Sequence, residues 1–512
     1  MATSFASRVT VIAASWLNSV ASLVEDVFAS ATTPAQARTA ISVDSSAEVT
    51  AKDDAIYAAF ASTDPGEGFH LVHYTKSAGE ISSGVYIDSP QYPVGDIRRY
   101  GADPLGVDDI GVAVQAAVDA ANQTTKSSRY IIFPPAEVGY NWATAVSLSF
   151  TADKSADITF IGHSDASRVD ATAAIDMLTI ENTVSNVRRV HFLNMYFNLS
   201  NTATAGLVLD TAAYCNVLGC QFINLGSGKG LVLDDTLGVR VANCWFFDGN
   251  GTCYGIYLDG EANNNNMVDN FFGENLGHGI YANGGASRRI FENTIAFNKF
   301  YGCDNNAITL VHADGNIIQG NHLRAIGNHG IEIYGSDNMI TGNRIKDYGS
   351  GSATADKVGV FINTINSTAS DNNRVTGNIF RDADNTASRI HVRIAASSGA
   401  ATDNLIADND FDNSATAISD AGTTTYKRNN LGYVTEAKGS QSVSSGTTAR
   451  TVTHGLSQTP THGDIWVTFS EQGDNDYGRW WISNITSTTF DVNVSANPGA
   501  SNLDFEWGAR CF

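Results

Sequence analysis

Hydrophobic positions between Val187 and Leu431 recur in two short phrases that alternate along the chain. The first phrase opens with glycine and then alternates apolar and variable positions, as in GLVLD (206–210 and 230–234), GIYLD (255–259), GIYAN (279–283), GIEIY (330–334) and GVFIN (359–363). Its first four glycines are 24, 25 and 24 residues apart. A fixed period in the twenties, built from runs of four or five residues, predicts stacked coils of short strands.

The second phrase places an asparagine or a cysteine before an apolar pair. We assign one position of this phrase to a set of residues that recurs along the repeat: Cys220, Cys244, Asn270, Asn293, Asn321 and Asn343. Leucine-rich repeats have a similar period, but the run of leucines that they require is missing. A parallel β-helix, whose coils lie about 4.8 Å apart, fits the pattern instead. It predicts that the amides of Asn270, Asn293 and Asn343 form one internal column.

Segments outside the repeat differ in composition. Residues 1–60 are alanine-rich with helical apolar spacing, and we expect them to dock on a partner or to trimerise. A wide interval before Asn378 predicts a looped-out insertion, GSGSATAD (349–356). Residues 436–448 have the composition of a linker, and residues 449–512 alternate like the strands of a small antiparallel β-domain.

Four tryptophans of the last segment admit two interpretations, a sugar-stacking platform or core and trimer contacts: Trp466, Trp480, Trp481 and Trp507. We favour the second, because the tryptophans occupy alternating strand positions.

Charge and cysteine content narrow the classes of function. The 512 residues carry a net charge of −22, which argues against binding to a nucleic acid backbone. We find no apolar run long enough to insert into a membrane and no basic-then-apolar signal segment, so we expect assembly in a cytoplasm. Six cysteines without a CxxC pair are too sparse for a disulfide scaffold, and we expect buried free thiols.

Side chains that alternate along a strand should line up into columns on the outer face of the solenoid. The third position of the glycine phrase gives a column of Val208, Val232, Tyr257, Tyr281, Glu332 and Phe361. The fifth position gives a column of Asp210, Asp234, Asp259, Asn283, Tyr334 and Asn363. The register of the irregular coil AITLVHA (307–313) stays open. Stacked carboxylates repel one another, which raises their pKa, and stacked tyrosines make a flat face for sugar rings.

A second acidic column follows the asparagine phrase: Asp248, Glu274, Asp347 and Asp382. Glycoside hydrolysis needs one carboxyl group as acid and another as base or nucleophile. We therefore predict Asp234, Asp259 and Glu274 as catalytic residues. The substrate-binding residues predicted beside them are Tyr257, Tyr281, Glu332 and His278. The other interpretation of any single one of these acids is a solvated turn residue.

A competing set of histidines and arginines fits a polysaccharide lyase, which needs a base for the C5 proton and cations for the uronate. His278 and His329 both precede a repeat glycine, and the same stretch contains His312, His322, Arg288, Arg289 and Arg324. No HxH or HExxH spacing occurs, so we predict no catalytic metal and no cofactor.

The segment before the repeat carries a family resemblance. Its strand, turn, amphipathic helix and Phe-Pro-Pro strand end keep a set of marker residues: Gly101, Ala102, Asp108, Asp109, Phe133, Pro134 and Pro135. In this it resembles pectate-lyase-like β-helix proteins, including many phage tailspikes, although Leu105-Gly106 departs from the usual Asp-Gly step. We expect the helix over 112–122 to cap the solenoid, and Asp108-Asp109 to serve the turn and the helix N-terminus rather than catalysis.

The resemblance implies three regions and a function. The regions are a virion-docking and neck segment (1–94), a right-handed parallel β-helix (95–435), and a C-terminal β-domain for trimerisation or glycan binding (436–512). The implied protein is a homotrimeric phage tailspike of the virion, attached through its N-terminus to a tail or baseplate protein. It would bind and depolymerise a bacterial O-antigen or capsule by endoglycosidic hydrolysis. The alternatives are β-elimination by a lyase and a non-enzymatic receptor-binding adhesin.

Overall fold

The structure is a computed structural model. It describes residues 74–511 except 124–128, 151–154, 183–186, Ala286, 350–356, 366–367, 383–388, 413–414 and 471–476. Most of the expected virion-docking segment, and the insertion expected at 349–356 apart from Gly349, therefore lie outside the described residues. No described helix is long and apolar enough to span a membrane.

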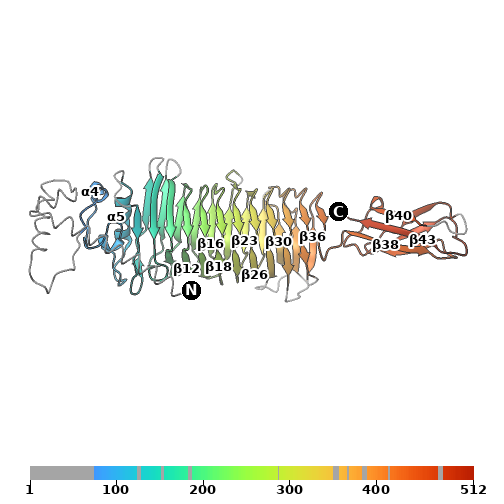
Figure 1. Cartoon of the computed structure of the whole chain (residues 1–512), viewed down its shortest axis with the longest axis horizontal. Coiled ribbons are helices and arrows are strands. Elements are labelled where there is room, and N and C mark those ends of the chain that lie inside the picture. Colours follow the sequence, from blue (N-terminus) through green and yellow to red (C-terminus); the bar gives the residue numbers. More distant parts are fainter. Residues whose placement is uncertain are drawn as a thin grey trace, which may run out of the picture. The chain divides into compact units, whose positions relative to one another are not determined.

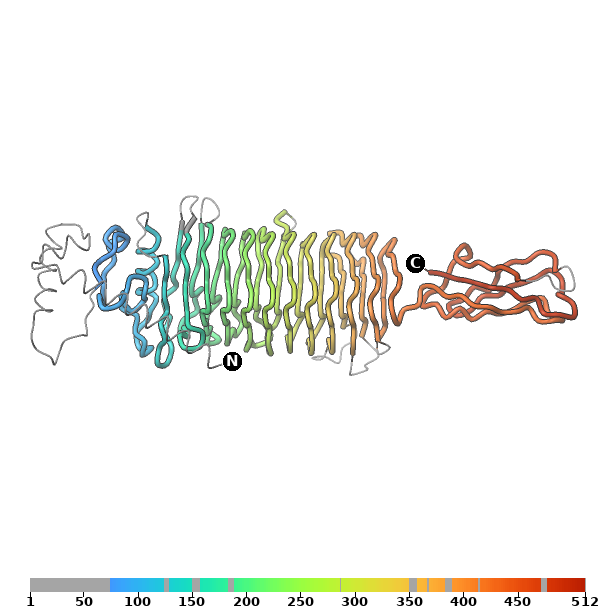
Figure 2. The backbone as a smooth tube through the Cα atoms, viewed as in Figure 1, coloured from blue at the N-terminus to red at the C-terminus, as the bar shows by residue number. Residues whose placement is uncertain are grey.

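Stacked coils form the greater part of the described chain, and each coil contributes strands to three parallel sheets (Figure 1). Sheet A has 13 strands, and sheets B and C have 11 each. Strands of successive coils pair in parallel register, for example Leu207 with Leu231 and Leu231 with Ile256. The tube trace shows how regularly the coils repeat (Figure 2). The prediction of a parallel β-helix is confirmed.

The strands of each sheet follow in chain order. Sheet A contains β1 (Tyr130–Ile132), β4 (Ser155–Ile161), β7 (Val187–Leu193), β10 (Ala212–Ala213), β11 (Asn216–Leu218), β14 (Arg240–Ala242), β17 (Asn266–Val268), β21 (Thr294–Ala296), β25 (Ile317–Gln319), β28 (Met339–Thr341), β31 (Arg374–Thr376), β34 (Leu405–Ala407) and β37 (Tyr426–Arg428). Sheet B contains β2 (Tyr140–Trp142), β5 (Arg168–Ala171), β8 (Tyr196–Asn198), β12 (Gln221–Gly226), β15 (Trp245–Gly249), β18 (Phe271–Phe272), β22 (Lys299–Tyr301), β26 (His322–Ile326), β29 (Arg344–Tyr348), β32 (Ile379–Arg381) and β35 (Asp410–Phe411). Sheet C contains β3 (Val146–Phe150), β6 (Asp176–Asn182), β9 (Ala205–Asp210), β13 (Lys229–Asp234), β16 (Tyr254–Asp259), β19 (His278–Asn283), β23 (Ile308–Val311), β27 (Ile331–Tyr334), β30 (Lys357–Ile362), β33 (Arg389–Ile394) and β36 (Thr416–Asp420). Two short strands, β20 (Ile290–Phe291) and β24 (Ala313–Asp314), pair outside these sheets.

The interior of the solenoid is filled by inward side chains that repeat from coil to coil. On sheet B a file of phenylalanines stacks face to face, with ring centroids 5.1 Å apart for Phe197 and Phe222, and 4.9 Å apart for Phe222 and Phe246. All six cysteines are buried and free, as expected. Each coil stacks only on its neighbours, so added coils lengthen the core along the axis and its size has no upper limit.

Asparagine side chains form two internal ladders rather than one. The first precedes the sheet B strands and contains Asn270, Asn298, Asn321, Asn343, Asn378, Asn409 and Asn430. The second precedes the sheet A strands and contains Asn265, Asn293, Asn316, Asn338, Asn373 and Asn404. The prediction that Asn293 shares a column with Asn270 and Asn343 is therefore wrong. The same asparagine phrase precedes two strands of each coil, and its sequence does not say which one follows.

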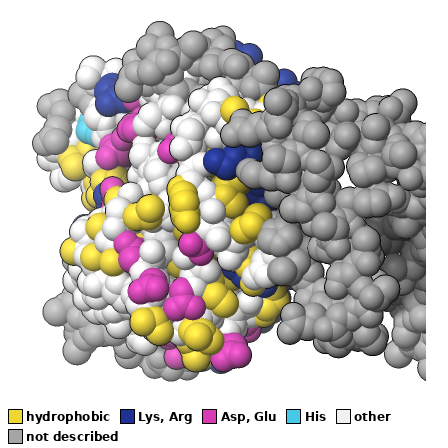
Figure 3. Space-filling view, turned by 90° about the vertical axis from the view of Figure 1, so that its left-hand side faces the viewer, with side chains coloured by type: hydrophobic (Ala, Val, Ile, Leu, Met, Phe, Trp, Pro, Cys, Tyr) yellow, Lys and Arg dark blue, Asp and Glu magenta, His cyan; other side chains and the backbone are white. Residues whose placement is uncertain are grey.

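The N-terminal end of the solenoid is covered by α5 (Gly111–Ala121), with α4 (Ala78–Ser83) and η1 (Ile97–Tyr100) beside it. Val114 and Val118 of α5 are buried in the core, whereas Val112 is 70% exposed. Asp109 Oδ1 accepts hydrogen bonds from the backbone N–H of Gly111 (3.0 Å) and Ala143 (2.8 Å). Asp109 thus ties the helix start to the first coil, as the sequence suggested. Viewed from this end, the described surface carries scattered acidic and hydrophobic side chains (Figure 3).

The C-terminal segment forms a separate core between two antiparallel sheets of three strands. Their strand orders are β38 (Glu436–Val443), β43 (Leu503–Arg510) and β40 (Ile465–Phe469), and β39 (Ala449–Thr453), β42 (Thr489–Val494) and β41 (Trp480–Ser483). A short helix, η2 (His462–Asp464), precedes β40. The predicted β-domain is confirmed, but the predicted linker is wrong over its first part, because β38 pairs along its full length with β43.

The four tryptophans of this domain do not share one surface. Trp507 is buried, whereas Trp466, Trp480 and Trp481 are exposed. Trp481 and its neighbour Trp480 point to opposite sides of β41 because side chains alternate along a strand. The four tryptophans therefore form neither one common core nor one common platform for sugar rings.

Candidate functional site

The outer face of sheet C carries the two predicted columns. Register pairing along β9, β13, β16, β19, β23, β27 and β30 places the first column as Val208, Val232, Tyr257, Tyr281, Thr309, Glu332 and Phe361. The second column runs Asp210, Asp234, Asp259, Asn283, Val311 and Tyr334. The register of the irregular coil (307–313), which the sequence left open, places Thr309 in the first column and Val311 in the second.

A cluster of carboxylates lies where β9, β13 and β16 end. Asp234 pairs in register with Asp210 on one side and with Asp259 on the other. Burial, together with the charges of Asp210, Asp235 and Asp259, raises the pKa of Asp234 to about 6, while Arg288 opposes the shift. The Asp234 carboxyl group therefore keeps its proton up to a higher pH than an ordinary aspartate does.

Glycine makes room for this cluster. Gly260 has a φ of +60°, and a Cβ there would lie 2.6 Å from Asp234 Oδ1 and would also contact Asp235 Oδ1 and Arg288 Nη2. The backbone N–H of Gly260 donates to Asp259 Oδ1 at 2.9 Å. Arg288 forms an ion pair with Asp235, so the only cation of the cluster is bound by the residue next to Asp234.

Aromatic rings cover the strands beside the carboxylates. The rings of Tyr257 and Tyr281 stack with centroids 5.7 Å apart, and Tyr254 meets both edge-on at 5.0 and 5.1 Å. Lys229 Nζ lies 4.0 Å from the centre of the Tyr257 ring. Burial is the main cause that raises the pKa of Tyr257 to about 12, so its hydroxyl stays protonated.

Tyr254 was not predicted as a site residue. Gly255 and Ile256 are both buried, so the inward and outward alternation is interrupted at the glycine and Tyr254 turns outward. A Cβ at Gly255 would lie 2.6 Å from the Gly279 carbonyl oxygen, which explains why this position holds glycine. The shared position of His278 and His329 before the repeat glycine was the signal that could have found Tyr254.

Polar side chains continue this face along the next coils. His278 stacks on Tyr254 with centroids 5.5 Å apart, and its Nδ1 lies 3.2 Å from Thr309 Oγ1. Burial lowers the pKa of His278 to about 4, so the imidazole is neutral at neutral pH. Asn306 Nδ2 donates to Glu332 Oε2 at 2.7 Å, and the Tyr334 hydroxyl donates to Glu332 Oε1 at 2.6 Å. The Glu332 carboxylate is thereby fixed on the outer face.

Glu274 lies apart from Asp234 and Asp259. It precedes β19, whereas the aspartates stand at the far ends of their strands, and the six residues of β19 span about 16 Å. Its backbone carbonyl accepts a hydrogen bond from the N–H of Asp248 at 3.3 Å, so these two acids do stack on adjacent coils. The structure brings together six of the seven predicted site residues on one sheet face and leaves Glu274 at its opposite edge.

The other members of the second acidic column are bound by cations. Asp382 is buried and forms an ion pair with Arg389. Asp347 lies 3.8 Å from Arg324 Nε and 3.7 Å from Lys346 Nζ. Asp382 and Asp347 therefore form ion pairs within the solenoid.

The cations expected for a lyase are also engaged. Arg288 pairs with Asp235, and Arg289 Nη1 lies 2.8 Å from Asp314 Oδ2. His329 Nδ1 accepts the backbone N–H of Val358 at 3.1 Å. These contacts neutralise Arg288 and Arg289 and hold the His329 ring in place.

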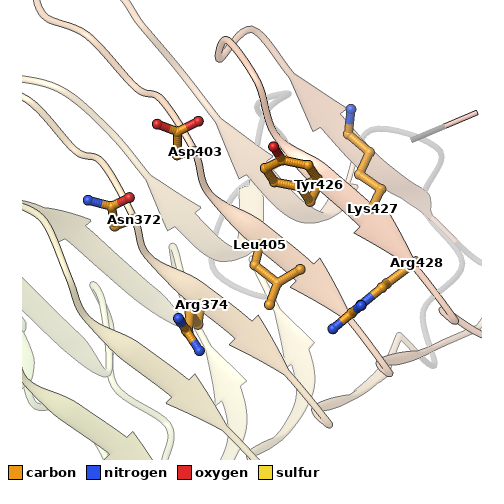
Figure 4. A pocket seen from close by; sticks show the side chains of 7 residues that line it. All are labelled: Asn372, Arg374, Asp403, Leu405, Tyr426, Lys427 and Arg428. Atoms are coloured by element: carbon orange, nitrogen blue, oxygen red, sulfur yellow. The ribbon is translucent and has the colours of Figure 1, made fainter.

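A hollow of about 540 Å³ lies elsewhere, on the outer face of sheet A. Figure 4 shows the seven side chains that line it, from the turns and strands of adjacent coils: Asn372, Arg374, Asp403, Leu405, Tyr426, Lys427 and Arg428. Lys427 Nζ is held by Asp420 at 2.6 Å. This hollow shares no strand with the predicted site residues, and no motif that we identified in the sequence pointed to it.

Comparison with solved structures identifies relatives of the fold. The tailspike gp61 of Pseudomonas phage phi297 superposes with a TM-score of 0.56 and 13% identity, covering 82% of this chain and 99% of that one. The protein ORF18 of Geobacillus virus E2 gives a TM-score of 0.51 and 14% identity, covering 79% and 76%. The chain has a tailspike-type parallel β-helix. At such low identity the likeness concerns the fold of the chain alone.

The tailspike-type β-helix is shared with a carbohydrate-active enzyme. DFA-IIIase from Arthrobacter chlorophenolicus A6, solved in complex with GF2, gives a TM-score of 0.50 and 15% identity, covering 65% of this chain and 92% of that one. No curated protein sequence matches the chain.

A family model described as "Periplasmic copper-binding protein (NosD)" matches residues 176–299, less than half of the chain. Among the residues that the structure describes, no three His, Cys, Asp or Glu side chains are grouped to hold a metal ion.

Proposed function

We propose that the protein is a phage tailspike subunit that binds a bacterial surface polysaccharide on the outer face of sheet C and hydrolyses it there. The observation that carries the proposal is the pKa of Asp234, raised to about 6 next to Asp259, its register partner on the following coil. Glycoside hydrolysis requires two carboxyl groups, one of which donates a proton, and a raised pKa suits Asp234 for that role.

In the proposed reaction Asp234 is the general acid and Asp259 the nucleophile. Adjacent coils are about 4.8 Å apart, which suits the short separation of a retaining pair rather than the wider one that admits water. Asp234 gives its proton to the glycosidic oxygen while the Asp259 carboxylate attacks the anomeric carbon, so that a glycosyl ester forms and the leaving sugar departs. Water then attacks the same carbon and gives a proton to Asp234, which frees Asp259 and leaves a new reducing end.

Other side chains of the face bind the glycan. The Tyr257 and Tyr281 rings offer stacking surfaces one coil apart, and Glu332 accepts hydrogen bonds from sugar hydroxyls. Neutral His278 offers a hydrogen bond without adding charge. Glu274 stands outside the reacting pair in this proposal, because a strand's width separates it from Asp259.

Hydrolysis is favoured over β-elimination by the ion pairs of Arg288 and Arg289 and by the low pKa of His278. A lyase needs cations that neutralise the uronate, but Arg288 and Arg289 are both bound by aspartates. A histidine with a pKa of about 4 is also a weak base for a carbon acid.

Assembly forms part of the proposal. From the resemblance to phage tailspikes we also infer a homotrimer that attaches to the phage tail through its N-terminal segment (1–94). The C-terminal β-domain contributes to trimer contacts or to glycan binding.

The test is incubation of the protein with candidate O-antigens and capsules, followed by sizing of the products and assay of reducing ends. We expect shortened glycan from the wild-type protein and none from Asp259→Asn, while Asp269→Asn, at an exposed turn of another corner, stays active. Ultraviolet absorbance from an unsaturated uronate, with Asp259→Asn still active, would make the protein a lyase. Binding without any shortening would make it an adhesin.

A further inference from the structure

The outer face of sheet B carries a concentration of positive charge, although the chain has a net charge of −22. One column pairs Lys299, His322 and Arg344 on successive coils. The column two residues further along the strands pairs Arg324 with Lys346. Alternation of buried and outward positions directs all five side chains to the same face.

These charges are only partly neutralised. Asp347 is shared between Arg324 and Lys346 at 3.8 and 3.7 Å. Within the part of the chain that the structure describes, no acidic partner is recorded for Lys299 or Arg344. Burial is the main cause that lowers the pKa of His322, and the nearby charges of Arg344, Arg324, Lys299 and Lys346 lower it further.

Exposed aromatic rings continue the same column on the two preceding coils. Trp245 pairs in register with Phe271, and Phe271 pairs with Lys299. Trp245 is 52% exposed, and its ring lies 5.4 Å from that of Phe271 and 6.4 Å from that of Phe247. From Trp245 to Arg344 the column spans four coil steps, or about 19 Å.

We propose that this surface, here called the cationic face (Trp245, Phe271, Lys299, Arg324, Arg344 and Lys346), is a second glycan-binding site, separate from sheet C, and that it takes an anionic polysaccharide. A sugar ring stacks on Trp245, and acidic groups of the following residues meet the cations of the next coils. The regular coil spacing presents the charges in a row, as a polymer with repeated acidic groups requires. Carboxylate and phosphate are the two acidic groups that guanidinium side chains bind best, so both belong to this ligand class.

The cationic face suits this ligand better than a nucleic acid. Binding to nucleic acid depends on extensive neutralisation of backbone phosphates, and the four cations of this face would neutralise few of them. A row of a few cations that begins at an exposed tryptophan fits a flexible chain of sugars with widely spaced charges.

The test measures binding by calorimetry with three defined probes: a decagalacturonate for carboxylate, a polyglycerol phosphate for phosphate, and a maltodecaose as neutral control. Asp259→Asn protein is used throughout, so that no probe is consumed at sheet C and failure of the proposed hydrolase leaves this measurement intact. We expect one or both anionic probes to bind, more weakly at higher salt, and the neutral probe to bind at least about tenfold more weakly.

Three further variants locate the site. Added to the same background, Arg344→Glu and Trp245→Ala should each weaken anionic binding about tenfold, because each removes one charge-assisted or stacking contact. Arg240→Glu changes the charge equally at an exposed position of sheet A and should leave binding unchanged. Arg344→Gln provides a milder variant if Arg344→Glu fails to fold.

Four outcomes overturn the proposal. Neither anionic probe binds, the neutral probe binds as tightly, or Arg240→Glu weakens binding as much as Arg344→Glu. In the fourth, Arg344→Glu lowers the oligomeric mass in light scattering and leaves binding unchanged, which would make the cationic face an interface between copies of the chain.

Discussion

Asp234 and Asp259 are register partners at the ends of adjacent strands of sheet C. Burial and the neighbouring acids raise the pKa of Asp234 to about 6, whereas Asp259 accepts a hydrogen bond from the backbone N–H of Gly260. The pair therefore places two carboxyl groups on neighbouring coils, and the pKa of one of them, Asp234, is raised.

The rate of hydrolysis should fall as the pH rises above about 6, because the proposed acid, Asp234, then loses its proton. Asp234→Asn should lower the rate by about three orders of magnitude and leave glycan binding intact. The rate is measured from reducing ends over a pH series, and binding by adsorption to cells. A rate that is flat from pH 5 to pH 8 would contradict the role of Asp234.

Stability should respond to the same carboxyl group. Its folded pKa of about 6 lies above the ordinary aspartate pKa of 3.8, so between these pH values the folded chain holds a proton that the unfolded chain has released. The contribution of Asp234 to stability is therefore largest below the unfolded pKa and is lost as the pH rises through about 6.

Asp234→Asn removes this loss because an amide does not ionise. We expect the variant to melt at a higher temperature than the wild type at pH 8 and at a more similar temperature at pH 4, by calorimetry. A variant that is less stable than the wild type at pH 8 would show that the ionised Asp234 carboxylate does not destabilise the folded chain at that pH.

The aromatic face should contribute to glycan affinity. Tyr281→Ala removes a ring that stacks on Tyr257, and we expect affinity for a bound glycan to fall about threefold to tenfold. Tyr281→Phe keeps the ring and should bind nearly as well as the wild type. Tyr426→Ala, at an exposed tyrosine of sheet A, is the matched control. Equal losses for Tyr281→Ala and Tyr426→Ala would show that the sheet C face is not the binding surface.

Much of the fold could be predicted because the coils of a solenoid repeat, so that equivalent residues recur at a regular interval in the sequence. The glycine phrase places Leu231, Ile256 and Ile280 inward and pairs them across coils, as the structure confirms. The asparagine phrase was less informative, because it occurs before the strands of both sheet A and sheet B. Asn293 was therefore assigned to the column that Asn298 occupies.

The candidate site could be predicted only where side chains alternate. Asp234, Asp259, Tyr257 and Tyr281 lie after the glycine, where the alternation is regular. Tyr254 lies before it, where two consecutive inward residues reverse the direction of the side chain. Glu274 stands in a turn, whose course the period of the strands does not describe. The cationic face also escaped notice, because only Arg324 of its members was considered, as part of a lyase site, and the pairing of the others across coils was not recognised.

The asparagine ladders should hold adjacent coils together. Asn321 Oδ1 accepts both the backbone N–H (2.9 Å) and Nδ2 (3.0 Å) of Asn298, and Asn321 Nδ2 donates to the carbonyl of Ile295 (2.9 Å). All of these groups are buried, so Asn321→Ala leaves donors and an acceptor without partners. Each unsatisfied buried group costs about 1–3 kcal/mol, and we expect the variant to lose about 3 kcal/mol or more of unfolding free energy. Asn266→Ala, at an exposed position of β17, makes the same chemical change outside the ladder and should cost little. Denaturant unfolding of the two variants measures the difference, and similar midpoints for both would show that the ladder does not stabilise the solenoid.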